Sequence, residues 1–209
     1  LPQGRGGLCG GAIYLHGDTA SCAPALKRLD TLAEAFAERH QDIGATAHRV
    51  KEMVYVMQVD SPDELWKIVH EKVPTLAAQT HIRLLVIDSV GGLYRTAADE
   101  AAAASGQQRA SAQAERAQHL MRLAARLKQL SSQYSLAIVV TNQVSDKPLS
   151  SESRRTAAPW ELGPCISSAD GQSVRVPALG AAWACCVNTR IVLTRVPGPG
   201  SGDGGQGGE

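Results

Sequence analysis

Short apolar runs recur along the chain and are separated by segments with helical spacing. Strongly apolar or β-branched runs bounded by polar residues or glycine predict buried strands. Runs that are continuously apolar are typical of strands covered on both faces, as in parallel sheets. The strands predicted in this way are Ala12–Leu15, Met53–Val59, Arg83–Asp88, Leu136–Thr141 and Ile191–Thr194.

Three segments between these strands have the periodicity of amphipathic helices. Before the second of them, Ser61 can cap a helix, Pro62 suits its first position, and Glu64 completes a capping box. Alternation of strands and helices predicts an α/β fold with right-handed connections and a mainly parallel sheet flanked by helices. The apolar positions of the helices are Leu26, Leu29, Leu32, Ala33 and Phe36; Leu65, Ile68, Val69, Val73 and Leu76; and Leu120, Leu123, Leu127 and Leu130.

Three polar stretches interrupt or follow this pattern. Thr96–Ala114 has no apolar face and is predicted to be a loop, and Ser145–Arg175 is a long segment rich in Ser, Pro and charge. Val196–Glu209 is rich in Gly and Pro and is predicted to be disordered, because it buries too little apolar surface. The expected organisation is therefore one core over residues 1–195 and a tail over residues 196–209.

Ligands of parallel sheets bind beyond the carboxyl ends of the strands, so the residues after each strand are candidates for chemistry. Asp88 follows four apolar residues and is placed either to hold Mg²⁺ beside phosphates or to cap the next helix. Asp18 is either a general base or a turn residue, and Gln143 either contacts a γ-phosphate or satisfies loop backbone. His16 is predicted to be a surface or turn histidine, because no second metal-ligating residue occurs at ligand spacing.

Composition narrows the class of protein. The 209 residues carry a formal net charge of +1, so any nucleic-acid contact must come from local basic loops. The longest mostly apolar run, Pro177–Val187, is too short to span a bilayer. An odd number of cysteines, five, without a C-x-x-C pair suggests reduced intracellular thiols; Trp183, Cys185 and Cys186 are expected to pack in the core.

Four blocks of sequence, in order, resemble the RecA-type recombinases of eukaryotes, and in particular their DNA-repair paralogues. The blocks are GAIYLHGD, RLLVIDSV followed by LYR, VVTNQV, and PALGAAWACCVNTRIVLTR. The similarity extends from Leu1 to Arg195, and its most specific parts are TNQV and the PALG block. The resemblance implies a RecA-like ATPase core that uses ATP and Mg²⁺.

The resemblance also implies roles for individual residues. Asp88 falls on the Walker B aspartate that supports Mg²⁺, and Gln143 falls on the glutamine that senses the γ-phosphate. Asp18 falls at or next to the catalytic glutamate and is one methylene shorter, so any hydrolysis is expected to be weak.

The two long polar stretches correspond to the DNA-facing loops of the family. Lys147, Arg154, Arg155 and Arg175 are candidate phosphate contacts, and Trp160 could stack on a base. Four acidic residues lie in the same segment, so a solvated loop that contacts nothing is the alternative interpretation. These acidic residues are Asp146, Glu152, Glu161 and Asp170.

The phosphate-binding loop that such a core needs is absent from these residues. No G-x-x-x-x-G-K-[ST] motif occurs, and the glycines between Gly4 and Gly11 are not followed by a lysine. Together with a first residue that is Leu rather than Met, this predicts an N-terminally truncated core that begins downstream of that loop.

The function implied by the resemblance is ATP-dependent DNA binding in homologous recombination and double-strand-break repair. The implied ligands are ATP, Mg²⁺ and single-stranded or branched DNA, and the implied partner is another recombinase paralogue in a hetero-oligomer in the nucleus. A weak DNA-dependent ATPase is expected. A non-catalytic scaffold subunit and a related hexameric motor are the alternatives, and the PALG block argues against the motor.

Overall fold

The computed structural model describes residues 7–17, 19–94, 106–148, 166–167 and 173–193. Its main sheet has four strands in the order β2-β1-β3-β4, and every neighbouring pair is parallel. The strands are β1 (Gly11–His16), β2 (Val54–Gln58), β3 (Ile82–Asp88) and β4 (Ala137–Val140). Four of the strands predicted from the sequence are thus confirmed, as is the α/β class.

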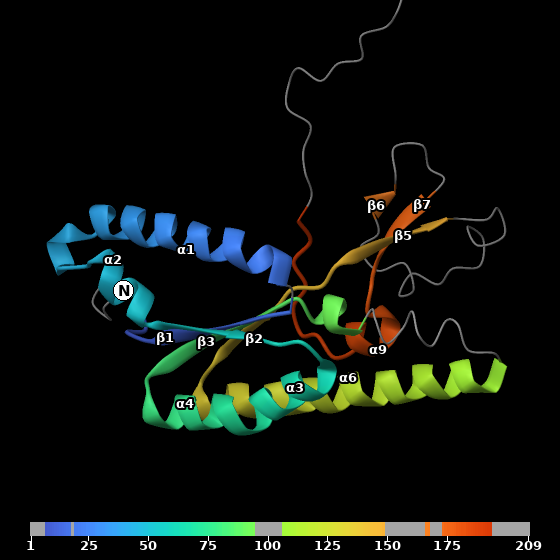
Figure 1. Cartoon of the computed structure of the whole chain (residues 1–209). Coiled ribbons are helices and arrows are strands. Elements are labelled where there is room, and N and C mark those ends of the chain that lie inside the picture. Colours follow the sequence, from blue (N-terminus) through green and yellow to red (C-terminus); the bar gives the residue numbers. More distant parts are fainter. Residues whose placement is uncertain (1–6, 18, 95–105, 149–165, 168–172, 194–209) are drawn as a thin grey trace, which may run out of the picture.

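Helices lie on both sides of this sheet (Figure 1). On one side lies α1 (Thr19–Arg39), and on the other lie α3, α4 and α6. The remaining bounds are η2 (Gln41–Ile43), α2 (Ala47–Glu52), α3 (Pro62–Lys67), the π-helical turn η3 (Ile68–Lys72), α4 (Val73–Gln79) and α6 (Gly106–Tyr134).

The hydrophobic core fills the space on one face of the sheet. Alternate residues of a strand point to the same face, and here Ile13 and Leu15 of β1 are buried together with Leu85 and Ile87 of β3. They belong to one cluster with the apolar residues of the helical segment from α3 to α4 and of α6. The helical contributors are Leu65, Ile68, Val69, Val73, Leu120, Leu123, Ala124, Leu127 and Leu130.

The opposite face of the sheet is covered less completely. Tyr14, Val86 and Val139 form one row across β1, β3 and β4; the first two are half-buried, but Val139 at the edge strand is 49% exposed. Among the described side chains of α1, only Ala33 is buried. The outer edge of β4 is therefore the most exposed apolar part of the main sheet.

The helix start predicted at Ser61 is confirmed. The Ser61 hydroxyl accepts a hydrogen bond from the Glu64 N–H at 3.1 Å. The reciprocal bond comes from the residue before the cap, since Glu64 Oε2 accepts from the Asp60 N–H at 2.8 Å. These bonds satisfy N–H groups that the start of a helix leaves without intrahelical partners.

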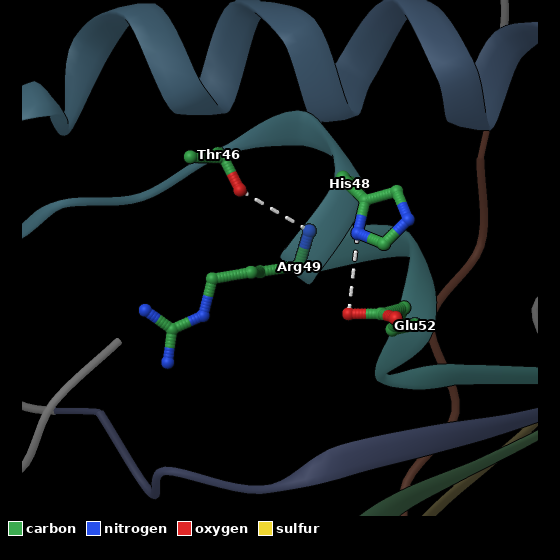
Figure 2. A network of polar contacts seen from close by, with 4 residues as sticks. All are labelled: Thr46, His48, Arg49 and Glu52. Carbon is green, nitrogen blue, oxygen red and sulfur yellow. Dashed lines mark hydrogen bonds and ion pairs between the residues drawn. The ribbon is translucent and has the colours of Figure 1, made fainter.

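A smaller polar network holds the short helix before β2 (Figure 2). The Thr46 hydroxyl accepts from the Arg49 N–H at 3.3 Å and caps α2, and His48 Nδ1 lies 3.3 Å from Glu52 Oε2. Both partners of the second pair are largely exposed, so it contributes little to stability. The cap is the main local reason why α2 begins at Ala47.

Two of the elements expected from the sequence need correction. Residues 106–114 are helical rather than a loop, because they form the start of α6. Residues 191–193 are not a strand; Ile191 is 82% exposed and Leu193 is 90% exposed. Thr194, the last residue of that predicted strand, lies outside the described residues.

The long polar segment after β4 contains a second sheet rather than only a loop. It is antiparallel, with the order β5-β7-β6, and α9 follows it. The elements are β5 (Val144–Pro148), β6 (Ile166–Ser167), β7 (Ser173–Pro177) and α9 (Gly180–Ala184). After β7, Trp183 is buried and Cys186 is half-buried as expected, but Cys185 is exposed.

None of the helices that the structure describes combines the length and the apolar character needed to cross a membrane.

Val139→Lys should have little effect on stability, because the side chain lies at an exposed edge. The free energy of unfolding should change by at most about 0.5 kcal/mol, and self-association, measured by light scattering, should fall because a charge blocks edge pairing. The matched control is Val86→Lys, one strand inward in the same row, which should cost about 1–3 kcal/mol in urea unfolding. Equal destabilisation by both variants would show that the β4 edge is covered.

Candidate functional site

The carboxyl ends of β1, β3 and β4 meet at one rim of the main sheet. The ladder continues one residue past two strands, since the Gly17 N–H donates to the Asp88 carbonyl at 2.8 Å and the Thr141 N–H donates to the Ile87 carbonyl at 3.0 Å. β3 lies between β1 and β4. The residues that follow the three strands are therefore neighbours in space although they are far apart in the sequence.

The Asp88 carboxylate is held by hydroxyls from both neighbouring strands. The Tyr14 hydroxyl, from β1, donates to Oδ2 at 2.8 Å. The Thr141 hydroxyl, directly after β4, donates to Oδ1 at 2.6 Å. Each oxygen thus accepts one hydrogen bond, and the carboxylate is fixed between two strands.

His16 is part of the same rim, at the last position of β1. It is paired in register with Asp88, it is 5% exposed, and its ring stacks on that of Tyr14 with centroids 6.1 Å apart. The prediction of a surface or turn histidine is wrong. The strand extends one residue further than the apolar run, and that residue is covered.

The helical turn after β3 packs against the residues after β4. A Cβ on Gly91, within the turn formed by residues 90–94, would lie 2.8 Å from Asn142 Oδ1 and 3.2 Å from the Gln143 N–H nitrogen. Asn142 Oδ1 is itself buried and has no hydrogen-bond partner among the described residues. The glycine therefore permits a close approach between the loop that follows Asp88 and the loop that contains Gln143.

Gln143 also joins the rim to the second sheet. Its carbonyl accepts from the Ala178 N–H at 2.9 Å, just after β7. The Ala178 carbonyl in turn accepts from Arg116 Nη2 of α6 at 3.3 Å. The next residues, Leu179 and Trp183, are buried in the core of the main sheet. A single residue, Ala178, thus links the rim to α6.

Tyr94, in the LYR segment, is a packing residue at the end of the turn after β3. It is buried, and its ring makes a T-shaped contact with that of His119 of α6, with centroids 5.6 Å apart. Burial raises the pKa of the Tyr94 hydroxyl well above its usual range; the Asp63 carboxylate adds to this and Arg116 opposes it. The phenol is therefore neutral at physiological pH, and Tyr94 supplies no charge to the rim.

The other predicted site residues are only partly described. Asp18, Arg154, Arg155 and Trp160 lie outside the described residues. Arg175 lies in β7, where it is paired with Asp146 of β5 and Ile166 of β6. The structure describes the backbone of Arg175 but not the position of the Arg175 side chain.

Two hydroxyls of this site were not singled out from the sequence. His16 is paired with Asp88. The alternation of side chains along a strand predicts that Tyr14 lies on the same face of β1 as His16. The register between β1 and β3 decides that the Tyr14 hydroxyl reaches Asp88, and the apolar pattern does not fix that register. The sequence pattern marks Thr141 only as the last residue of a predicted strand and as the first residue of the TNQV block.

The donor set fits a magnesium ion of the kind that accompanies a nucleotide. Such an ion is held by one or two carboxylates, by water and by the phosphates themselves, and Asp88 supplies one carboxylate at the rim. A carboxylate offers about four lone-pair sites, and the two hydroxyls occupy two of them. Asp88 is thus the residue of the described rim best suited to hold Mg²⁺.

Comparisons with known proteins agree with the motifs. A family model described as Rad51 matches residues 1–162. The chain is 33% identical over 202 residues to a protein named "DNA repair protein XRCC3 homolog" from Arabidopsis thaliana, covering 95% of this chain and 62% of the relative.

Two animal proteins are similar over a comparable part of the chain. One is "DNA repair protein XRCC3" from Bos taurus, 30% identical over 93% of this chain and 50% of the relative. The other is "DNA repair protein RAD51 homolog 2" from Homo sapiens, 27% identical over 92% of this chain and 48% of the relative. The chain therefore spans about half to three fifths of the length of these relatives.

Gly91→Ala should destabilise the protein, because the added methyl group would displace Asn142 and Gln143. A loss of about 1–3 kcal/mol in the free energy of unfolding is expected from urea denaturation. Gly92→Ala is the matched control, since its Cβ would meet only Ser89 Oγ at 3.4 Å. In a helical turn that change should be neutral or stabilising by about 0.4–1 kcal/mol. Similar effects of the two substitutions would contradict the close packing at Gly91.

Proposed function

Because this chain belongs to the Rad51 family, we propose that it acts in homologous recombination and double-strand-break repair as an ATP-dependent DNA-binding recombinase paralogue. The family match and the names of the relatives support this assignment. The observation that carries the mechanism is the convergence of Asp88 and the Thr141–Gln143 segment on one rim.

In this proposal, Asp88 holds Mg²⁺ and Gln143 contacts the γ-phosphate of ATP. When bound, Mg²⁺ neutralises charge on the phosphate oxygens. Gln143 has an amide that can donate to a phosphate oxygen, and its backbone carbonyl is bonded to Ala178 after β7. A movement of Gln143 would therefore also shift the residue that follows β7 at the end of the second sheet.

DNA contact is assigned to the second sheet and the segments next to it. Arg154, Arg155 and Arg175 would contact phosphates, and Trp160 would stack on a base of single-stranded or branched DNA. The protein would act in the nucleus together with another recombinase paralogue, and the relatives' names, which describe DNA repair proteins, support the repair role. Asp18 would orient the water that attacks the γ-phosphate, less effectively than a glutamate because its side chain is shorter.

A non-catalytic scaffold subunit is the second candidate. It is favoured by Asp18, which falls at or next to the family's catalytic glutamate, and by the weakly basic character of the two loops. In that case the rim would be a structural remnant, and repair would not depend on Asp88.

These 209 residues alone should bind ATP weakly. The phosphate-binding loop G-x-x-x-x-G-K-[ST], which supplies backbone N–H groups and a lysine for the phosphates, does not occur in them. Isothermal titration of the chain with ATP and Mg²⁺ checks this, with ADP as the comparison. Tight, saturable ATP binding would contradict the expectation and would require a phosphate site elsewhere in the chain.

In a full-length chain that also carries the phosphate-binding loop, Asp88→Ala should abolish double-strand-break repair in cells that lack the natural copy. Survival after a break-inducing treatment is the measurement, with protein abundance checked in parallel. The matched control is Asp30→Ala, which removes an exposed carboxylate of α1 that pairs with Lys51 at 3.0 Å. Full repair by the Asp88 variant would favour the scaffold, whereas its loss with normal abundance supports a nucleotide-dependent role.

A further inference from the structure

The two hydroxyls on Asp88 come from opposite sides of its strand. Tyr14 reaches Oδ2 from β1 at 2.8 Å, and Thr141 reaches Oδ1 from the end of β4 at 2.6 Å. The terminal torsion of an aspartate has a broad energy profile when no partner holds it. Here each oxygen is bonded to a donor from a different neighbouring strand, so rotation of the carboxylate would disturb both hydrogen bonds and its plane is set by the two strands.

Both donors are themselves held by the main sheet. Tyr14 lies inside β1, which is bonded to β2 on one side and to β3 on the other, and its ring stacks on His16. The Thr141 N–H donates to the Ile87 carbonyl, one residue before Asp88. The hydroxyls are thus parts of a rigid frame, which is the arrangement that orients a metal-binding carboxylate most effectively.

We propose that Tyr14 and Thr141 are positioning residues that orient the Asp88 carboxylate for a divalent cation. The inference rests on the proposed function, in which Asp88 holds Mg²⁺. Magnesium requires nearly ideal octahedral geometry, so a ligand with a fixed plane binds it better than one that rotates. The two lone-pair sites that the hydroxyls leave free remain for the cation or its water shell.

A purely structural role makes a different prediction. If the hydroxyls only satisfy a half-buried carboxylate, their removal lowers stability and leaves cation affinity unchanged. If they orient the carboxylate, cation affinity falls even in variants that remain folded. Removing a partner of a metal-binding group usually weakens metal binding by about 10- to 100-fold.

The test is a titration of the 209-residue chain with Mn²⁺, a paramagnetic substitute for Mg²⁺, with free Mn²⁺ measured by electron paramagnetic resonance. The variants are Asp88→Ala, Tyr14→Phe, Thr141→Val and Thr141→Ser. Tyr55→Phe is the matched control, because Tyr55 lies on β2 in register with Ile13 and therefore on the other face of the sheet from Tyr14. Circular dichroism and the melting temperature of each variant show whether it is folded.

Asp88→Ala should abolish the Mn²⁺ binding, which is weak in this chain because one carboxylate and no phosphates supply the ligands. Tyr14→Phe and Thr141→Val should each weaken it by about 10-fold or more, while Thr141→Ser, which keeps the hydroxyl, and Tyr55→Phe should bind Mn²⁺ like the unsubstituted chain. Mn²⁺ binding that depends on Asp88 but is unchanged in the Phe and Val variants overturns the positioning role alone. If Thr141→Ser, which keeps the hydroxyl, also weakens Mn²⁺ binding, the positioning role of the Thr141 hydroxyl is overturned. Absence of any Asp88-dependent site overturns the cation role of Asp88 as well.

Discussion

Hydrogen bonds between parallel strands place the ends of β1, β3 and β4 together, and the chemistry of the rim depends on this. In parallel pairing the strands run in the same direction, so their carboxyl ends lie at one edge. Here the ladder runs one residue past the strands, to Gly17 and Thr141. That extension lets Thr141 donate both its N–H, to Ile87, and its hydroxyl, to Asp88.

The two faces of the main sheet differ in how much apolar surface they bury. One face carries the buried residues Ile13, Leu15, Leu85 and Ile87 and is closed by the helical segment from α3 to α4 and by α6. The other face ends at a β4 edge where Val139 remains half in solvent. Stability in the described residues therefore comes mainly from one face, while polar Tyr14 can lie on the other without entering the hydrophobic core.

The sequence predicts the four strands of the main sheet well, because the apolar run of each strand can be recognised without knowing which strand pairs with it. It fails where the outcome depends on context. Residues 106–114 are helical because a helix elongates readily once the leucine stripe of α6 has nucleated it. Ile191–Leu193 is apolar and contains two β-branched residues, yet a strand also needs a neighbour to bond, and the described part of the chain places none beside it. Asp88 is found from its position alone, whereas the Tyr14 hydroxyl bond requires the register.

The contact between Gly91 and Asn142 shows how local constraints converge on the rim. Any side chain at position 91 would push against the Asn142 amide and the Gln143 backbone. Those atoms connect onward, because the Gln143 carbonyl binds Ala178 and the Ala178 carbonyl binds Arg116. A displacement at the rim must therefore be absorbed either in the core around Leu179 and Trp183 or in the second sheet. Close-packed cores resist such deformation, so we expect the second sheet, whose strand β5 begins directly after Gln143, to move more easily than the core.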